Sequence, residues 1–64
     1  MLLKYIGIDG LYGLEEGRVY RCSVRTMYGY IWVQWGNRSD IDPARHYENF
    51  SEFFDDWQEV GEGA

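Results

Sequence analysis

Residues 18–36 contain two β-like segments around one turn signal, and this pattern constrains the fold more than any other part of the chain. β-branched and aromatic residues dominate, and apolar and polar residues alternate on both sides of Tyr28-Gly29. A shift of one residue would turn every side chain to the opposite face, so the alternation determines the register. A turn at Tyr28-Gly29 pairs the following residues: Met27 with Tyr30, Arg25 with Trp32, Val24 with Val33, and Cys22 with Trp35. The segment predicts a long β-hairpin.

The alternation assigns the side chains of this hairpin to two faces. The face expected to line the core carries Tyr20, Cys22, Val24, Ile31, Val33 and Trp35. The other face carries Arg21, Ser23, Arg25, Tyr30, Trp32 and Gln34. Large aromatic rings are unusual on a face that should be polar, and Trp, Tyr and Arg dominate interface hot spots. The predicted partner-binding residues are therefore Arg21, Arg25, Tyr30, Trp32 and Gln34. Two alternatives stay open, namely that a C-terminal helix covers these rings or that Arg25 simply stacks on Trp32.

The remaining strands and loops are expected to complete a small sheet. Residues 3–8 alternate and predict a first strand, which Asp9-Gly10 ends. Residues 11–17 predict a loop anchored by Leu11, Tyr12 and Leu14, with a positive φ at Gly17. Residues 36–45 predict a second loop, and residues 44–47 a further short strand.

Residues 49–60 change period and predict a C-terminal helix. Phe50, Phe53, Phe54 and Trp57 occur at i, i+3, i+4 and i+7, and Asn49 with Glu52 resembles a capping box. The aromatic stripe is expected to belong to the core. The opposite side forms a secondary acidic surface of Glu52, Asp55, Asp56 and Glu59. Such a surface is typical of the wet side of a helix, and the alternative is a mimic of nucleic-acid charge.

Length and composition bound the function. A chain of 64 residues predicts one domain over 1–64, whose core depends on three Trp, six Tyr and three Phe. Self-association would bury more surface, so a homo-oligomer is a second expected form. The net charge of -5 argues against nucleic acid as a partner. One cysteine, no signal-peptide pattern and no apolar stretch of membrane-spanning length lead us to expect a cytoplasmic protein and no membrane partner.

The order of these elements predicts an all-β fold, a small and strongly bent antiparallel barrel with a short C-terminal helix. Residues 14–20, Leu-Glu-Glu-Gly-Arg-Val-Tyr, followed by Ile-Trp-Val at 31–33, resemble the start of Src-homology-three-like small barrels. Residues 47–57 are similar to the tails of short bacteriophage proteins of that type. The resemblance implies an accessory protein or an inhibitor of host defence. The proline-peptide groove of the signalling members is not carried over, because their acidic first loop and proline–tyrosine ending have no match here.

Catalytic chemistry is not predicted. The serines lack a nucleophile-elbow context, and Cys22 falls on the inward face, where a free cysteine behaves as a small apolar residue. Asp40, Asp42 and His46 could gather around a metal ion, but a solvated loop with Asx turns is the more typical reading. We therefore expect no cofactor and no metal.

These observations predict a non-enzymatic binding protein that engages a protein partner through the outer hairpin face. One alternative is a ligand sequestrant that stacks a nucleotide and holds its phosphate with Arg21, Arg25 or Arg38. Another is a single-stranded nucleic-acid binder that uses Tyr30 and Trp32 as stacking platforms.

Overall fold

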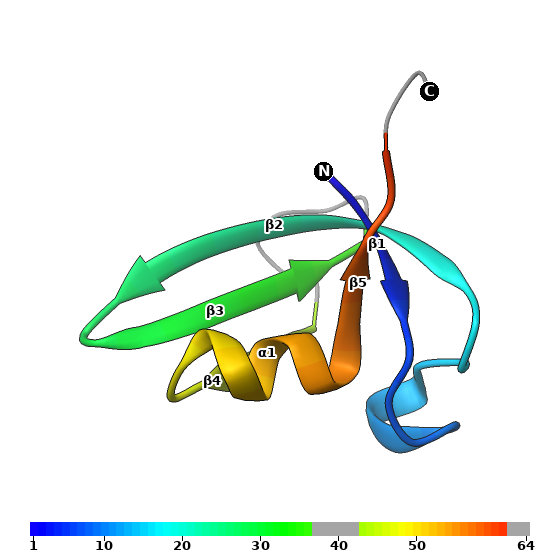
Figure 1. Ribbon diagram of the computed structural model, residues 1–64, viewed down its shortest axis with the longest axis horizontal. Coiled ribbons are helices and arrows are strands. Elements are labelled where there is room, and N and C mark those ends of the chain that lie inside the picture. Colours follow the sequence, from blue (N-terminus) through cyan, green and yellow to red (C-terminus); the bar gives the residue numbers. More distant parts are fainter. Residues whose placement is uncertain (37–42, 62–64) are drawn as a thin grey trace.

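The computed structural model describes residues 1–36 and 43–61. Its strands form one antiparallel sheet with the order β4-β3-β2-β1-β5 (Figure 1). Along the chain the elements are β1 (Leu2–Tyr5), the 3-10 turn η1 (Leu11–Gly13), β2 (Val19–Met27), β3 (Tyr30–Trp35), β4 (Ala44–Tyr47), α1 (Phe50–Asp56) and β5 (Trp57–Glu59). Arg38, Asp40 and Asp42, which entered the sequence interpretation, lie outside the described residues.

The predicted hairpin is confirmed as β2 and β3. Every predicted pair is present, from Met27 opposite Tyr30 to Cys22 opposite Trp35. Tyr28 and Gly29 form the turn with φ values of 56° and 80°. Positive φ at both central residues is characteristic of type I′ turns, whose twist matches that of the flanking strands. The short strand predicted at residues 44–47 is confirmed as β4, which pairs with β3.

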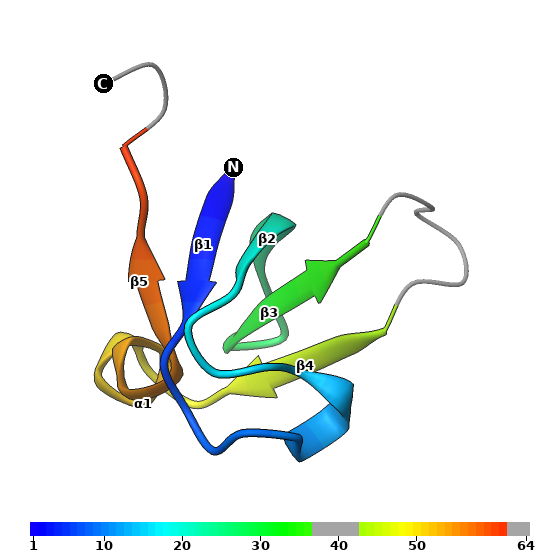
Figure 2. The ribbon, with the colours of Figure 1, turned by 90° about the vertical axis from the view of Figure 1, so that its right-hand side faces the viewer.

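The nine-residue strand β2 belongs to two halves of the sheet. Its residues 19–21 pair with β1, and its residues 22–27 pair with β3. Consequently β1 and β5 run at a wide angle to β3 and β4 (Figure 2). The prediction of a bent, mostly antiparallel β fold with one short helix is confirmed.

The prediction of a barrel is wrong, because the sheet does not close. Within the described residues, β4 and β5 are the two edges and do not pair with each other. The helix α1 connects β4 to β5 and packs against both strands. The helix therefore covers the core at the opening where a closed barrel would have a further ladder.

The start of α1 agrees with the predicted cap. The side chain of Asn49 accepts a hydrogen bond from the Glu52 backbone N–H at 2.9 Å. The Glu52 carboxylate accepts in turn from the backbone N–H of Glu48 at 3.3 Å. This is a capping box displaced by one residue, and it gives otherwise unpaired N–H groups a partner.

The predicted end of the helix at residue 60 is wrong, because α1 stops at Asp56. Trp57 has extended dihedrals (φ −133°, ψ 140°) and begins β5 opposite Tyr5. Its ring lies 5.2 Å from the ring of Tyr5 and 5.9 Å from that of Trp35, measured between centroids. β1 thus offers this residue both backbone pairing and ring contacts, and tertiary packing overrides the helical pattern.

The core lies on the inner side of the bent sheet. Its buried members are Leu3, Tyr5, Leu14, Cys22, Ile31, Val33, Trp35, Tyr47, Phe53 and Trp57, and Tyr20 and Val24 pack against it. Every hairpin side chain that the alternation directed inward is therefore buried or half-buried against this core. The anchor predicted at Leu14 and the positive φ predicted at Gly17 are also confirmed.

Two sets of predicted core residues are corrected. Phe50 and Phe54 are 53% and 49% exposed, because a helix of seven residues turns only Phe53 toward the sheet. Their rings stack on each other with centroids 6.2 Å apart. Tyr12 is not a buried anchor, since its side chain is 62% exposed on η1.

Candidate functional site

The outer face of β2, β3 and β4 carries the predicted binding residues. Trp32 in the middle of β3 lies opposite Arg25 on one side and His46 on the other. Side chains directly opposite in neighbouring strands share a face of the sheet, so these three project together. Tyr30 and Gln34 lie two residues before and after Trp32 on the same face.

Tyr30, Trp32 and His46 form one group, which we name the outer aromatic group. The His46 ring lies 4.9 Å from the Trp32 ring at 38° and 5.1 Å from the Tyr30 ring at 74°, measured between centroids. The indole N–H of Trp32 donates to the Met27 carbonyl at 3.2 Å, which holds the ring along its own hairpin. The group is therefore positioned by local contacts while Tyr30 and His46 stay exposed.

The helix does not cover the outer aromatic group. Phe53, the buried residue of α1, contacts Tyr47 on the inner side of the sheet, with ring centroids 5.9 Å apart. Arg25 does not stack on Trp32 either. Within the described residues its guanidinium lies over no aromatic ring, and the His46 ring packs on Trp32 instead. Neither of the two expected coverings of the outer rings is therefore present among the described residues.

A pocket of about 170 Å³ adjoins Trp32 on this face. It is lined by Ser23, Arg25, Met27, Trp32, Gln34 and Ala44. Pockets that bind small molecules usually enclose about 300 to 1,000 Å³. This one is therefore suited to one side chain of a partner rather than to a nucleotide.

The structure brings together four of the five predicted binding residues. Arg25, Trp32 and Gln34 line the pocket, and Tyr30 joins them through the ring of His46. Arg21 is exposed on the same side of β2 but opposite Leu2 of β1, in the other half of the sheet. It lines no part of this pocket.

His46 is the member of this site that sequence reasoning missed. The sequence suggested it only as a metal ligand with Asp40 and Asp42, which lie outside the described residues. Its place beside Trp32 depends on the pairing of β4 with β3. Alternation within residues 44–47, with Tyr47 turned inward, was the available signal.

The predicted acidic surface loses one member. Glu52, Asp55 and Glu59 are exposed, but Asp56 is largely enclosed between α1 and β4. Its carboxylate accepts hydrogen bonds from Arg45 Nη1 at 2.6 Å and from the Tyr47 hydroxyl at 2.8 Å. Asp56 is therefore a structural residue, because at the last position of the helix its side chain turns toward β4.

The Asp56 contacts extend into a network across the core. The indole N–H of Trp57 donates to the Tyr47 hydroxyl at 3.0 Å, and the guanidinium of Arg45 lies over the rings of Tyr12 and Tyr47. Burial, followed by the hydrogen bond to Asp56, raises the pKa of Tyr47 well above its ordinary value. The phenol consequently stays protonated and keeps its role as a donor.

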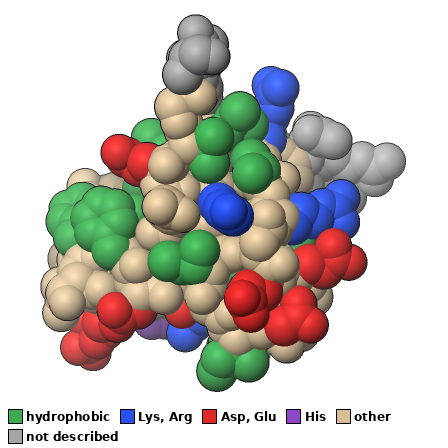
Figure 3. Space-filling model, turned by 45° about the vertical axis from the view of Figure 1, so that its right-hand side comes forward, with side chains coloured by type: hydrophobic (Ala, Val, Ile, Leu, Met, Phe, Trp, Pro, Cys, Tyr) green, Lys and Arg blue, Asp and Glu red, His purple; other side chains and the backbone are tan. Residues whose placement is uncertain are grey.

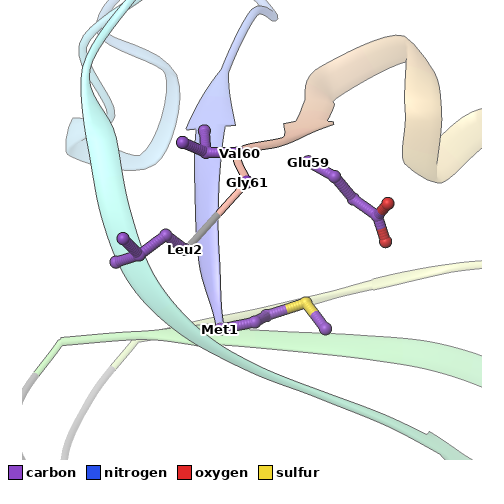
Figure 4. Close-up of a pocket in the computed structure, with 5 residues that line it drawn as sticks. All are labelled: Met1, Leu2, Glu59, Val60 and Gly61. Atoms are coloured by element: carbon purple, nitrogen blue, oxygen red, sulfur yellow. The ribbon is translucent and has the colours of Figure 1, made fainter. Parts of the chain in front are cut away.

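A larger pocket of about 590 Å³ lies where β1 begins and β5 ends (Figure 4). Figure 4 shows Leu2 and Val60 on one side of these strands and Met1 and Glu59 on the other. Among its lining residues the only charged side chain is the carboxylate of Glu59, and the N-terminal ammonium of Met1 donates to the Cys22 carbonyl at 2.9 Å. On the side of the molecule in Figure 3, hydrophobic side chains form separate groups between charged ones.

The described part of the chain holds no metal-binding group, reactive thiol or membrane-spanning helix. No group of three His, Cys, Asp or Glu side chains among these residues could hold a metal ion. Cys22 is a buried free thiol, and burial raises its pKa to about 11, which suppresses the reactive thiolate. No helix among the described residues has the length and apolar character needed to cross a bilayer.

Comparison of this chain with protein-family models, with curated proteins and with solved structures gave no match. The resemblance to small phage barrels therefore stays a prediction.

Proposed function

We propose that this chain is a non-enzymatic binding protein that docks onto a protein partner through the outer face of β2, β3 and β4. The observation that carries the proposal is the outer aromatic group, which α1 leaves uncovered beside Arg25 and a pocket of side-chain size. Trp, Tyr and Arg around a small recess are the composition of interface hot spots.

The arrangement suits tight docking because the Trp32 ring is already held in place. Its contacts with His46 and with the Met27 carbonyl exist before any partner arrives, so little side-chain entropy is lost on binding. Within the described residues, the outward positions of β2, β3 and β4 include Arg21 and Arg25 and no carboxylate. A partner with an acidic surface would therefore be favoured, although the chain as a whole carries a net charge of -5.

The two alternative functions have less support. A nucleotide is large for a pocket of about 170 Å³, and the residues that line the wider pocket at Glu59 include no Lys or Arg side chain. A stack of bases would need open ring faces, but His46 already packs on Trp32. Docking of a protein requires neither a larger pocket nor an open face of the Trp32 ring.

The resemblance to Src-homology-three-like phage proteins would give this docking a biological role. An accessory protein or inhibitor of host defence that acts by stoichiometric occupancy needs a rigid face and no catalytic centre. The bent antiparallel sheet is compatible with that class, and the exposed Glu52, Asp55 and Glu59 would help to orient the approach.

The test compares Trp32→Ala with Phe54→Ala, which removes an exposed ring on α1 instead. Proteins captured from a lysate by the wild-type chain are identified by mass spectrometry, purified and titrated by calorimetry. Trp32→Ala is expected to weaken binding by at least about 2 kcal/mol, roughly thirtyfold, while Phe54→Ala binds like the wild type. Sedimentation of the purified chain replaces the titration if the partner is a second copy.

Circular dichroism and thermal melting of the variants are the folding control. Equal affinity of the wild type and Trp32→Ala, with both chains folded, would remove the outer face from the proposal. Release of a nucleotide on denaturing extraction of the purified protein would favour the sequestrant instead.

A further inference from the structure

Tyr28 at the tip of the hairpin has a backbone conformation that its side chain opposes. Its φ of 56° lies in the left-handed region, where a bulky residue is strained. The first central position of a type I′ turn favours Asn, Asp or Gly for this reason. The tyrosine at this position therefore costs the fold stability that an asparagine would not.

Tyr12 provides the internal comparison, because it is the other residue besides glycine with positive φ in the described chain. Its φ is 54°, and its ring lies 5.2 Å below the guanidinium of Arg45, which is paired with Asp56. The ring of Tyr12 thus contributes to a network that joins η1, β4 and α1. Its strain accompanies a contact within the fold.

Within the described residues, Tyr28 has no corresponding contact. Its side chain is 86% exposed and makes no hydrogen bond, ion pair or ring contact with the described part of the chain. The tip projects from one end of the molecule (Figure 1). The described part of the fold therefore bears the strain of Tyr28 without a contact to its ring.

The tip is continuous with the docking face. Met27 and Tyr30 flank the turn and are 41% and 39% exposed, and Met27 also lines the pocket beside Trp32. We infer that Tyr28 is an anchor whose ring enters a recess of an acidic protein docked on the outer face. This inference rests on the function proposed above. A tyrosine ring supplies a large contact area with few rotatable bonds, and its hydroxyl can donate to a carbonyl or carboxylate within the recess.

The decisive variant is Tyr28→Asn, because the inference predicts opposite effects on stability and on binding. Asparagine relieves the strain, so the melting temperature is expected to rise. The ring is lost, so affinity for the purified captured protein is expected to fall at least tenfold. Tyr28→Phe keeps both ring and strain and is expected to retain most of the affinity. Tyr12→Asn makes the same exchange away from the docking face and is expected to leave the affinity unchanged.

The outcomes separate this inference from the proposed function. If Tyr28→Asn binds like the wild type while Trp32→Ala does not, Tyr28 is not an anchor, and the outer face remains the docking face. If neither variant changes the affinity, or if no protein is captured in a Trp32-dependent manner, both are wrong. A lower melting temperature for Tyr28→Asn would show that the ring stabilises the fold, and the strain argument would fail.

Discussion

The aromatic residues inside the sheet and those outside it differ in what their polar atoms bind. Inside, the indole N–H of Trp57 donates to Tyr47, and the Tyr47 hydroxyl donates to Asp56, so the network joins β5, β4 and the end of α1. Outside, the indole N–H of Trp32 donates to Met27 of its own hairpin. The polar atoms of the inner rings join separate elements, whereas the polar atom of the outer ring binds within its own hairpin. Substitution of the inner rings is expected to affect folding, and substitution of the outer ring is expected to affect binding.

The largest effect is expected for Trp57→Ala. The ring is fully buried among Tyr5, Tyr20 and Trp35, so its loss leaves a cavity and removes the N–H that donates to the Tyr47 hydroxyl. The free energy of unfolding is expected to fall by about 3 to 5 kcal/mol, which is close to the whole stability of a small domain. Denaturant titration measures this. Phe54→Ala on the exposed side of α1 is the control, and an equal loss there would contradict the comparison.

The next effect concerns the carboxylate that ends the inner network. Asp56→Ala leaves Arg45 and the Tyr47 hydroxyl without their acceptor in a place largely closed to water, and a loss of about 2 to 3 kcal/mol is expected. Glu15→Ala is the matched control, because it breaks the exposed Arg18–Glu15 pair, whose length is 3.3 Å. Surface pairs contribute little, so Glu15→Ala is expected to keep the wild-type unfolding midpoint.

A smaller effect is expected from the thiol of Cys22 at alkaline pH. Burial raises its pKa from 9.0 to about 11, so the folded protein binds this proton more tightly than the unfolded chain does. This contribution to stability is complete below pH 9 and is lost as pH rises toward 11, amounting to about 1 kcal/mol by pH 10. Unfolding midpoints from pH 8 to 10 of the wild type and Cys22→Ala test it. Parallel curves would show that the thiol is not responsible.

The smallest effect on stability is expected for Trp32→Ala, the variant that should most affect binding. The ring is half-buried and its contacts lie within one face of the hairpin and β4, so the unfolding free energy is expected to change by less than about 1 kcal/mol. A loss comparable to that of Trp57→Ala would erase the distinction between the inner and outer rings.

Local patterns predicted the hairpin and the face that carries Trp32, because alternation and a two-residue turn leave one register that buries the apolar set. They did not reveal the strain at Tyr28, since sequence alternation does not report φ. They predicted β4 but not the contact of His46 with Trp32. This contact depends on the pairing of β4 with β3, which the pattern within residues 44–47 does not contain.

The errors at the C-terminal end have a common cause. Trp57 satisfies the helical spacing of the phenylalanines, yet its partner Tyr5 lies in the first strand. In the sequence Asp56 does not differ from its exposed acidic neighbours, and only the folded chain brings Arg45 of β4 beside it. Both outcomes depend on contacts between elements distant in sequence, which periodicity within residues 49–60 does not contain.

The position of β1 between β2 and β5 has a consequence for synthesis of the chain. β2 follows β1 closely and can pair with it early, whereas β5 is the last of the described elements to be made. Until Trp57 and Glu59 have left the ribosome, Leu3 and Tyr5 lack their partners in β5, and Tyr5 also lacks the contact with the ring of Trp57. The pairing of β2 with β3 is local in sequence and can form first, but the core is completed only when β5 arrives. A nascent chain stopped before Trp57 would expose its inner aromatic residues and become a substrate for chaperones and proteases.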